Sequence, residues 1–205
     1  MRVLIINGSP RINGNTSIAV QEIENVFKEN NIEYDTFQIG NKCIRGCQAC
    51  GYCEKNNKCV FDDEVNKISP YFEKADGLII ASPVYYGSAN GTLISFLDRL
   101  FYSSNFDKTM KVGASIVIAR RSGCSATFDE LNKYFTISNM PVCSSQYWNN
   151  VHGCSKGEAS LDQEGLQTMR TLANNMIFLM KSIELGKKEY GLPKKEKGIA
   201  TNFIR

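Results

Sequence analysis

The start of the chain joins a buried-strand pattern to a polar loop and then to an amphipathic helix. Residues Arg2–Asn7 enclose a continuous apolar run that ends in a Gly-Ser-Pro turn, as a strand buried in a parallel sheet does. A helical pattern follows at about 16–29, where Ala19, Ile23 and Val26 fall on one face. A strand, a turn and a helix in this order favour an α/β fold.

The same alternation continues along the chain. Strand patterns cover residues 2–7, 32–39, 77–81, 112–119 and, more weakly, 141–147. Helical stripes cover about 16–29, 65–72, 93–101, 128–135 and 166–183. These five strand–helix units predict one domain over residues 1–186, with helices on both faces of a parallel sheet. We expect a cysteine-rich insertion at 40–62 and a basic tail at 187–205.

Composition narrows the class of protein. With 205 residues, 42% hydrophobic and 22% charged, the chain can bury one globular core. Its net charge of +3 is too small to indicate nucleic acid or an anionic membrane as a partner. The apolar run at the start is too short for a signal peptide, and no later segment approaches the roughly 18 apolar residues of a membrane span. We therefore expect a cytoplasmic protein, whose eight cysteines bind metal or react rather than form disulfides.

The loop after the first strand has the chemistry of a phosphate site. Gly14 can turn backbone N–H groups inward, and the following helix adds positive charge at its N-terminus. A simple turn with a helix cap needs fewer polar groups. The sequence lacks the Gly-Lys-Ser/Thr of a P-loop and the Gly-x-Gly-x-x-Gly of a dinucleotide fold. The candidate residues for phosphate are Ser9, Arg11, Asn13, Asn15, Thr16 and Ser17.

The loop after the third strand pattern carries two adjacent tyrosines. It reads Ser-Pro-Val-Tyr-Tyr-Gly-Ser-Ala-Asn-Gly over residues 82–91. Burial of both Tyr85 and Tyr86 is not expected at a strand end, so they can present an aromatic platform with exposed amides. One core tyrosine and one surface tyrosine is the plain alternative. The platform suits a flat heteroaromatic ring.

Together, GSPRINGNT after the first strand, SPVYYGSANG after the third and the helix end Leu97-Asp98-Arg99 resemble the NADPH-dependent FMN reductase family of flavodoxin-like proteins. The resemblance covers residues 1 to about 186. It implies a flavodoxin-like doubly wound α/β fold, with a five-stranded parallel sheet in the order 2-1-3-4-5 and FMN at its carboxyl edge. The first-loop residues would hold the FMN phosphate. The residues implied to line the isoalloxazine ring are Pro83, Val84, Tyr85, Tyr86, Gly87, Arg120, Arg121, Ser122 and Gly123.

The insertion holds a compact set of cysteines, Cys47, Cys50, Cys53 and Cys59. Bacterial ferredoxin clusters use a similar run with two-residue gaps. Within the family, the set resembles the cysteine motif of the iron–sulfur flavoproteins, which bind a [4Fe–4S] cluster beside FMN. Zinc and free thiols are the alternatives, although structural zinc usually takes two separated Cys-x-x-Cys knuckles. Cys43 can substitute as a ligand.

The leading hypothesis is an FMN oxidoreductase that needs no protein nucleophile or general base. Electrons would come from NAD(P)H, which the resemblance alone supplies, or from a ferredoxin-like donor. They would pass to a small-molecule acceptor, through the cluster if it is present. The alternatives are a flavin or quinone reductase without a cluster, a non-enzymatic electron carrier and a zinc-stabilised binding module. By analogy with the family we expect a homodimer or homotetramer.

Overall fold

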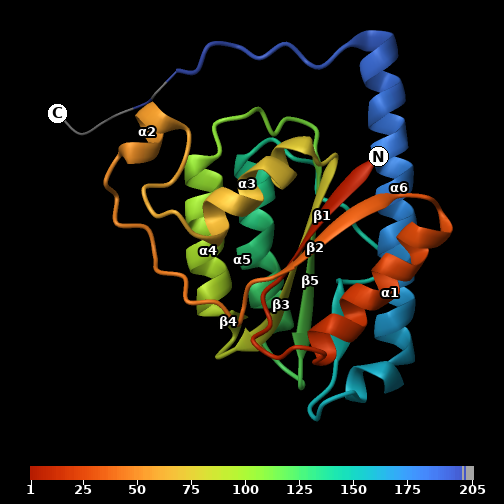
Figure 1. Ribbon diagram of the computed structural model, residues 1–205. Coiled ribbons are helices and arrows are strands. Elements are labelled where there is room, and N and C mark those ends of the chain that lie inside the picture. The colour runs from red at the N-terminus through yellow and green to blue at the C-terminus, as the bar shows by residue number, and fades with distance from the viewer. Residues whose placement is uncertain (200, 202–205) are drawn as a thin grey trace.

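The computed structural model describes residues 1–199 and 201 of the chain. Its sheet has five parallel strands in the order β2-β1-β3-β5-β6, and a two-residue strand pairs antiparallel with β3 (Figure 1). The strands are β1 (Arg2–Asn7), β2 (Glu33–Gln38), β3 (Gly77–Tyr85), β4 (Ser88–Ala89), β5 (Val112–Ala119) and β6 (Asn150–His152). Counted along the chain, the parallel strands have the predicted order 2-1-3-4-5, so the predicted flavodoxin-like fold class is confirmed.

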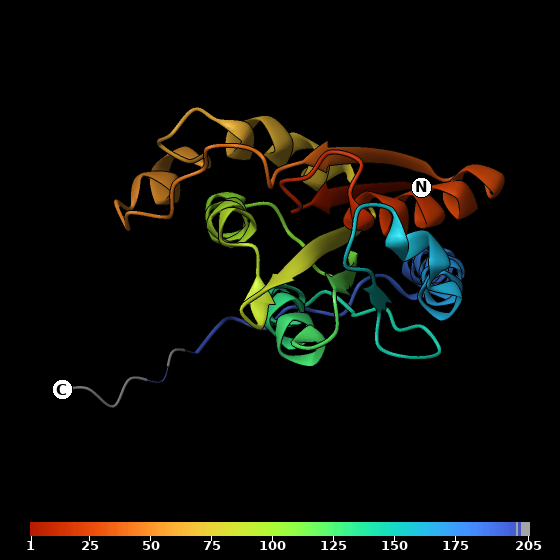
Figure 2. The same cartoon turned by 90° about the horizontal axis from the view of Figure 1, so that it is seen from below.

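Helices cover both faces of the sheet, as predicted (Figures 1 and 2). One face packs on α1 (Asn15–Glu29) and α6 (Gln163–Tyr190), and the other on α3 (Glu64–Lys74), α4 (Gly91–Ser103) and α5 (Cys124–Ile137). Successive residues of β1 alternate between the two layers: Val3 and Ile5 join the first, Leu4 and Ile6 the second. All four are fully buried, which explains the unbroken apolar run of this strand.

The fifth parallel strand lies later in the chain than predicted. The weak pattern at 141–147 forms only an isolated bridge between Gly113 and Val142. The strand itself is Asn150–His152, which pairs with residues 117–119 of β5. Only Val151 of its three residues is buried, so the segment carries no apolar run. Pairing with β5 defines this strand, and local propensity does not reveal it.

The cysteine-rich segment at 40–62 passes outside α4 and contains one short helix, α2 (Tyr52–Asn56); Figure 2 shows it in orange, away from α1 and α6. At the other end of the chain, α6 continues to Tyr190 and so includes the first four residues of the expected basic tail. An ion pair between Glu184 and Lys188 (3.4 Å) and the basic last turn favour this extension. Residues 200 and 202–205 of the expected tail lie outside the described residues.

Across residues 1–199 and 201, no helix combines the length and the apolar character that a membrane span requires.

The turn that enters the first loop packs against the backbone of Gly40. A Cβ at Gly40 would lie 2.1 Å from the Gly8 carbonyl oxygen and 2.3 Å from the Ser9 carbonyl carbon. We expect Gly40→Ala to lower the free energy of unfolding by roughly 1–3 kcal/mol, because rigid backbone must move. Gly91→Ala is the matched control, since its Cβ would meet open space. Urea unfolding measures both variants, and equal stability of the two would contradict this packing.

Candidate functional site

The loops after β1, β3, β5 and β6 meet at the carboxyl edge of the sheet, the lower edge in Figure 1. They enclose a cavity of about 160 Å³, called here the inner cavity. Ligands of open α/β sheets bind beyond this edge. The inner cavity is lined by Ser9, Arg11, Gly14, Asn15, Thr16, Pro83, Val84, Tyr85, Ile118, Ala119, Arg120, Gly153, Cys154 and Lys156.

The first loop is shaped by its own hydrogen bonds. The Ser9 N–H donates to Asn7 Oδ1 (2.9 Å), and the Arg11 N–H donates to Ser9 Oγ (3.2 Å). At the start of α1, the N–H groups of Asn15 and Thr16 donate to no protein group within the described part of the chain. Free amides at the N-terminus of a long helix form an anion-binding arrangement.

The charges around the inner cavity have one sign. Arg11, Arg120 and Lys156 line it, and its described lining includes no carboxylate. Thr16 is only 2% exposed but reaches the cavity wall. Cations, free amides and a hydroxyl favour an oxyanion with more than one negative charge.

Not every residue of the first loop faces this cavity. Asn13 is exposed and adopts a left-handed conformation (φ 57°). Ser17 Oγ accepts a hydrogen bond from Asn7 Nδ2 (3.3 Å). Neither lines the inner cavity.

The Asn15 side chain ties the loop after β6 to α1. Its Nδ2 donates to the Ser155 carbonyl (2.9 Å), and its Oδ1 accepts the N–H groups of Gly157 (3.0 Å) and Ala159 (3.3 Å). The sequence predicts this side chain as a phosphate ligand, whereas here its polar atoms hold protein backbone. Its backbone N–H, which has no partner among the described residues, is available to an anion.

We expect Asn15→Ala to loosen this loop. Three hydrogen bonds are lost, so the free energy of unfolding should fall by about 1–3 kcal/mol. Hydrogen exchange should accelerate at the amides of Gly157 and Ala159 and stay unchanged in β1. Unchanged exchange at both loop amides would contradict the anchoring role.

A second, outer cavity of about 330 Å³ adjoins the inner one and shares Val84, Ala119 and Arg120 with it. The remaining residues of its lining are Tyr86, Gly87, Arg121 and Ser122. Tyr86 is fully exposed and Tyr85 is 41% exposed, so neither ring is part of the core. The structure therefore brings the predicted second and third loops together beside the anion-binding loop.

Gly123 lines neither cavity but allows the two loops to approach. Its φ is +92°, and a Cβ there would lie 2.8 Å from Val84 Cγ1 and 3.0 Å from Gly87 Cα. A side chain at this position would thus combine backbone strain with a clash. Its role as a ring contact stays a prediction, and the structure adds a role in loop packing.

Sequence reasoning missed the loop after β6. Gly153, Cys154 and Lys156 line the inner cavity. Glu158 holds this loop by accepting the N–H groups of Cys154 (2.7 Å) and Ser155 (2.8 Å). These backbone hydrogen bonds lower the pKa of the Glu158 carboxyl. The sequence predicts the fifth strand at 141–147, and it therefore does not predict that residues 153–156 lie at the carboxyl edge of the sheet.

The cysteine-rich segment builds a separate cavity of about 450 Å³ against α4, called here the cysteine cavity. All four predicted ligands line it: Cys47, Cys50, Cys53 and Cys59. Over the described residues, no three His, Cys, Asp or Glu side chains converge closely enough to hold a single ion. The thiols are thus spread around a wall rather than gathered at one point. Cys43 is exposed and lies outside this lining.

Arg99 is the charged group inside this wall. It is 1% exposed, and its Nε and Nη2 each lie 3.2 Å from Cys59 Sγ. Its guanidinium also forms two hydrogen bonds to Asp63 (2.6 and 2.9 Å). Burial lowers the pKa of Arg99, but the hydrogen bonds to Asp63 and Cys59 outweigh it, and the net shift is upward. The side chain is therefore a fixed cation.

The cysteine cavity and the carboxyl edge lie at opposite ends of α4. The cavity contacts Asp98–Ser103 at the end of this helix, whereas Gly91 at its start follows β4. Figure 1 shows α2 near one end of α4 and β4 at the other. At 1.5 Å per residue, Gly91 and Asp98, the first cavity residue on α4, lie about 10 Å apart along the helix. The two sites of one chain are therefore not adjacent.

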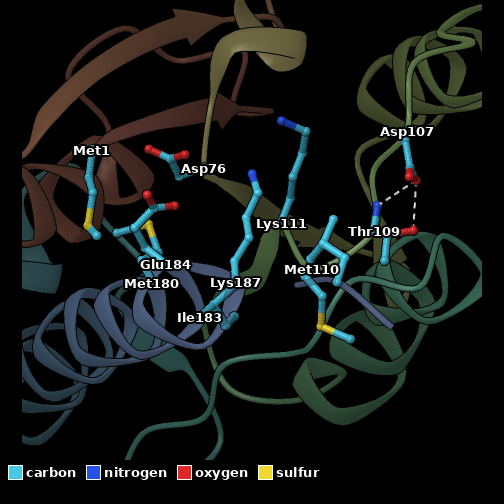
Figure 3. Close-up of a pocket in the computed structure, with 11 residues that line it drawn as sticks. Met1, Asp76, Asp107, Thr109, Met110, Lys111, Met180, Ile183, Glu184 and Lys187 are labelled. Atoms are coloured by element: carbon cyan, nitrogen blue, oxygen red, sulfur yellow. Dashed lines mark hydrogen bonds between the residues drawn. The ribbon is translucent and has the colours of Figure 1, made fainter. Parts of the chain in front are cut away.

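A further cavity lies at the other edge of the sheet, where the strands begin. It measures about 600 Å³ and is lined by side chains that include Asp76, Lys111 and Lys187 (Figure 3). Two of its polar side chains already have partners: Lys111 Nζ donates to the Glu73 and Ala75 carbonyls, and Asp107 accepts the Thr109 hydroxyl and N–H. The lining carries both positive and negative side chains, and ligands of open α/β sheets bind at the opposite edge, so we assign no ligand to this cavity.

Comparison with known proteins defines the class. The sequence model of the family described as NADPH-dependent FMN reductase matches residues 1–153. The chain therefore belongs to the NADPH-dependent FMN reductase family, which confirms the predicted class of FMN oxidoreductase.

The names of individual relatives are more specific than the description of the family. An iron–sulfur flavoprotein of Methanocaldococcus jannaschii is 31% identical over 192 residues, covering 90% of this chain and 100% of that protein. An iron–sulfur flavoprotein of Methanosarcina thermophila is 31% identical over 188 residues, covering 90% and 97%. Among solved structures, an archaeal flavodoxin has a TM-score of 0.60 at 15% identity and covers 88% of this chain and 99% of its own, a likeness of fold alone.

Proposed function

We propose that this FMN oxidoreductase binds the FMN phosphate in the inner cavity and the isoalloxazine ring in the outer one. The free N–H groups of Asn15 and Thr16 and the cations Arg11 and Lys156 would hold the phosphate dianion. The absence of carboxylates among the described lining residues of the inner cavity supports this orientation, because a dianion would be repelled by them.

The outer cavity has the groups that a flavin ring needs. Val84 offers apolar contact and the exposed Tyr86 offers aromatic surface, while Pro83 and Tyr85 add both from the adjoining wall of the inner cavity. Arg120 and Arg121 place positive charge beside the proposed ring, and a cation near its N1–C2 edge favours the reduced, anionic form. When bound, FMN supplies hydride acceptance and one-electron release.

We also propose that Cys47, Cys50, Cys53 and Cys59 hold a [4Fe–4S] cluster, which supplies one-electron exchange when bound. The single observation that carries this part is that all four thiols of the compact motif line one cavity. Zinc fits less well because its four ligands must converge on one ion, and these thiols do not. The names of the iron–sulfur flavoprotein relatives agree with the cluster.

The proposed electron path runs from NAD(P)H or a ferredoxin-like donor to a small-molecule acceptor. Four basic residues of the cysteine-rich segment would attract an acidic protein donor: Lys42, Arg45, Lys55 and Lys58. A homodimer or homotetramer belongs to this proposal by analogy with the family. Sedimentation of a monomer alone would count against it.

Anaerobic purification followed by analysis of FMN, iron, sulfide and zinc tests the proposal. We expect one FMN and about four iron and four sulfide per chain, and reduction of the flavin by NADPH. Failure to take up added FMN would overturn the flavin site. Zinc without sulfide would overturn the cluster. Reduction by a ferredoxin but not by NADPH would favour an electron carrier over an NADPH oxidoreductase.

A further inference from the structure

Arg99 is the most deeply buried charge in the described protein, and it is directed at one of the four cysteines. It heads the fully buried side chains by volume. A buried guanidinium is costly unless its five N–H groups find acceptors. Two of these N–H groups, on Nε and Nη2, point at Cys59 Sγ at 3.2 Å each. A buried cation therefore donates two hydrogen bonds to the sulfur atom of one cysteine.

Asp63 holds the guanidinium from the other side. Its two carboxylate oxygens accept from Nη1 (2.6 Å) and Nη2 (2.9 Å) of Arg99. Asp63 also caps α3 by accepting the Val65 N–H (3.1 Å). The Arg99 guanidinium lies 5.0 Å from the centre of the Phe61 ring, and the Arg45 carbonyl accepts a further N–H (3.3 Å). Residues of the cysteine-rich segment and the N-cap of α3 thus fix the position of the cation.

An arginine that only anchors this segment to α4 would not need the sulfur. Its bonds to Asp63 and the Arg45 carbonyl already provide that anchor. A neutral thiol is a weak acceptor, whereas a sulfur that ligates iron carries negative charge and accepts strongly. Among the described residues, the other N–H···S contact to these four cysteines is from the backbone of Ala49 to Cys47 Sγ (3.4 Å). Cys59 is therefore distinguished among the four.

We propose that Arg99 is a positioning residue. It holds Cys59 in place as the cluster ligand next to α4, and it raises the reduction potential of the cluster. Asp63 limits this rise. This inference rests on the proposed cluster. Hydrogen bonds to ligand sulfurs and nearby positive charge stabilise the reduced, more negative cluster. Asp63 offsets part of that charge, so the two residues act in opposite directions on the potential and in the same direction on stability.

The test is a redox titration of the purified full-length protein, followed by electron paramagnetic resonance, for four single variants. Arg99→Met removes the buried cation and both N–H···S bonds, and should lower the equilibrium constant for cluster reduction at least tenfold, or about 59 mV for one electron. Arg99→Lys keeps the charge but not the fork, so it should shift the potential in the same direction by less.

Asp63→Asn keeps a helix-capping side chain and removes the opposing carboxylate. It should raise the potential. Lys58→Met is the matched control for Arg99→Met, because it removes one positive charge that is adjacent in sequence to Cys59 but exposed. Screening by water should keep its shift below tenfold in the equilibrium constant.

The outcomes separate the two proposals. Wild-type protein without iron and sulfide overturns the cluster, and this role of Arg99 with it. Wild-type protein with a cluster, but with equal potentials in the Arg99 and Lys58 variants, overturns the role of Arg99 alone. Shifts of the same sign for Arg99→Met and Asp63→Asn indicate a purely structural pair. If Arg99→Met fails to fold, opposite shifts for Arg99→Lys and Asp63→Asn still support the proposal, and equal ones overturn it.

Discussion

Replacing Thr16 with aspartate is expected to raise the Kd for FMN about 100-fold. Thr16 is almost fully buried, lines the inner cavity and contributes a free N–H at the start of α1. Aspartate is close to threonine in size and would place a carboxylate against the phosphate. Two unit charges 4 Å apart repel by about 4 kcal/mol at an effective dielectric constant of 20. A 100-fold change in Kd needs only about 2.8 kcal/mol.

Three comparisons isolate the cause of that loss. Riboflavin lacks the phosphate, so its Kd should change much less than that of FMN in Thr16→Asp. Thr16→Val removes the hydroxyl without adding charge and should weaken FMN only modestly. Asn13→Asp places the same charge in the same loop but outside the cavity, on an exposed residue. Quenching of flavin fluorescence measures each Kd, and equal weakening of FMN and riboflavin would show that the phosphate lies elsewhere.

Much of the fold can be predicted from the sequence because the strands and helices of the core have uninterrupted hydrophobic patterns. The apolar run of β1 and the stripe Leu93, Phe96, Leu97 and Leu100 of α4 are fully buried, as their spacing predicts. β6 could not be predicted in the same way. It has three residues, one of them buried, and its existence depends on pairing with β5, more than 30 residues earlier in the chain.

The candidate site could likewise be predicted only in part. Residue types alone mark the loop after β1 as an anion site, because amides, hydroxyls and a cation are close in sequence. They do not reveal what each side chain does. Asn15 is the example: its partners Ser155, Gly157 and Ala159 lie some 140 residues away, so its structural role is invisible in the sequence.

The role of Arg99 could not be predicted from the sequence at all. In the sequence it is the last residue of a helix-end motif and carries no sign of a metal site. Its partners Cys59 and Asp63 lie 40 and 36 residues earlier, across a segment without periodicity. The cysteine spacing predicts that four thiols can surround one object, but only the packing against α4 shows that a buried cation faces one of them.

Removing the cysteines one at a time should give the second large effect. We expect alanine at Cys47, Cys50, Cys53 or Cys59 to reduce bound iron and sulfide roughly tenfold or more, since even substitutions outside the ligand set can cost that much affinity. Cys43→Ala should retain both, because Cys43 is exposed and outside the cysteine cavity. Metal and sulfide analysis of anaerobically purified protein measures each content.

FMN content distinguishes loss of the cluster from loss of the fold. The cysteine cavity contacts α4 from Asp98 onward, about 10 Å along the helix from its start, so all five cysteine variants should keep FMN at the wild-type level. Loss of iron in Cys43→Ala together with retention in Cys59→Ala would replace the half-buried Cys59 by the exposed Cys43 as the ligand. Arg99 would then face a free thiol, and its two N–H···S bonds would have no role toward a cluster.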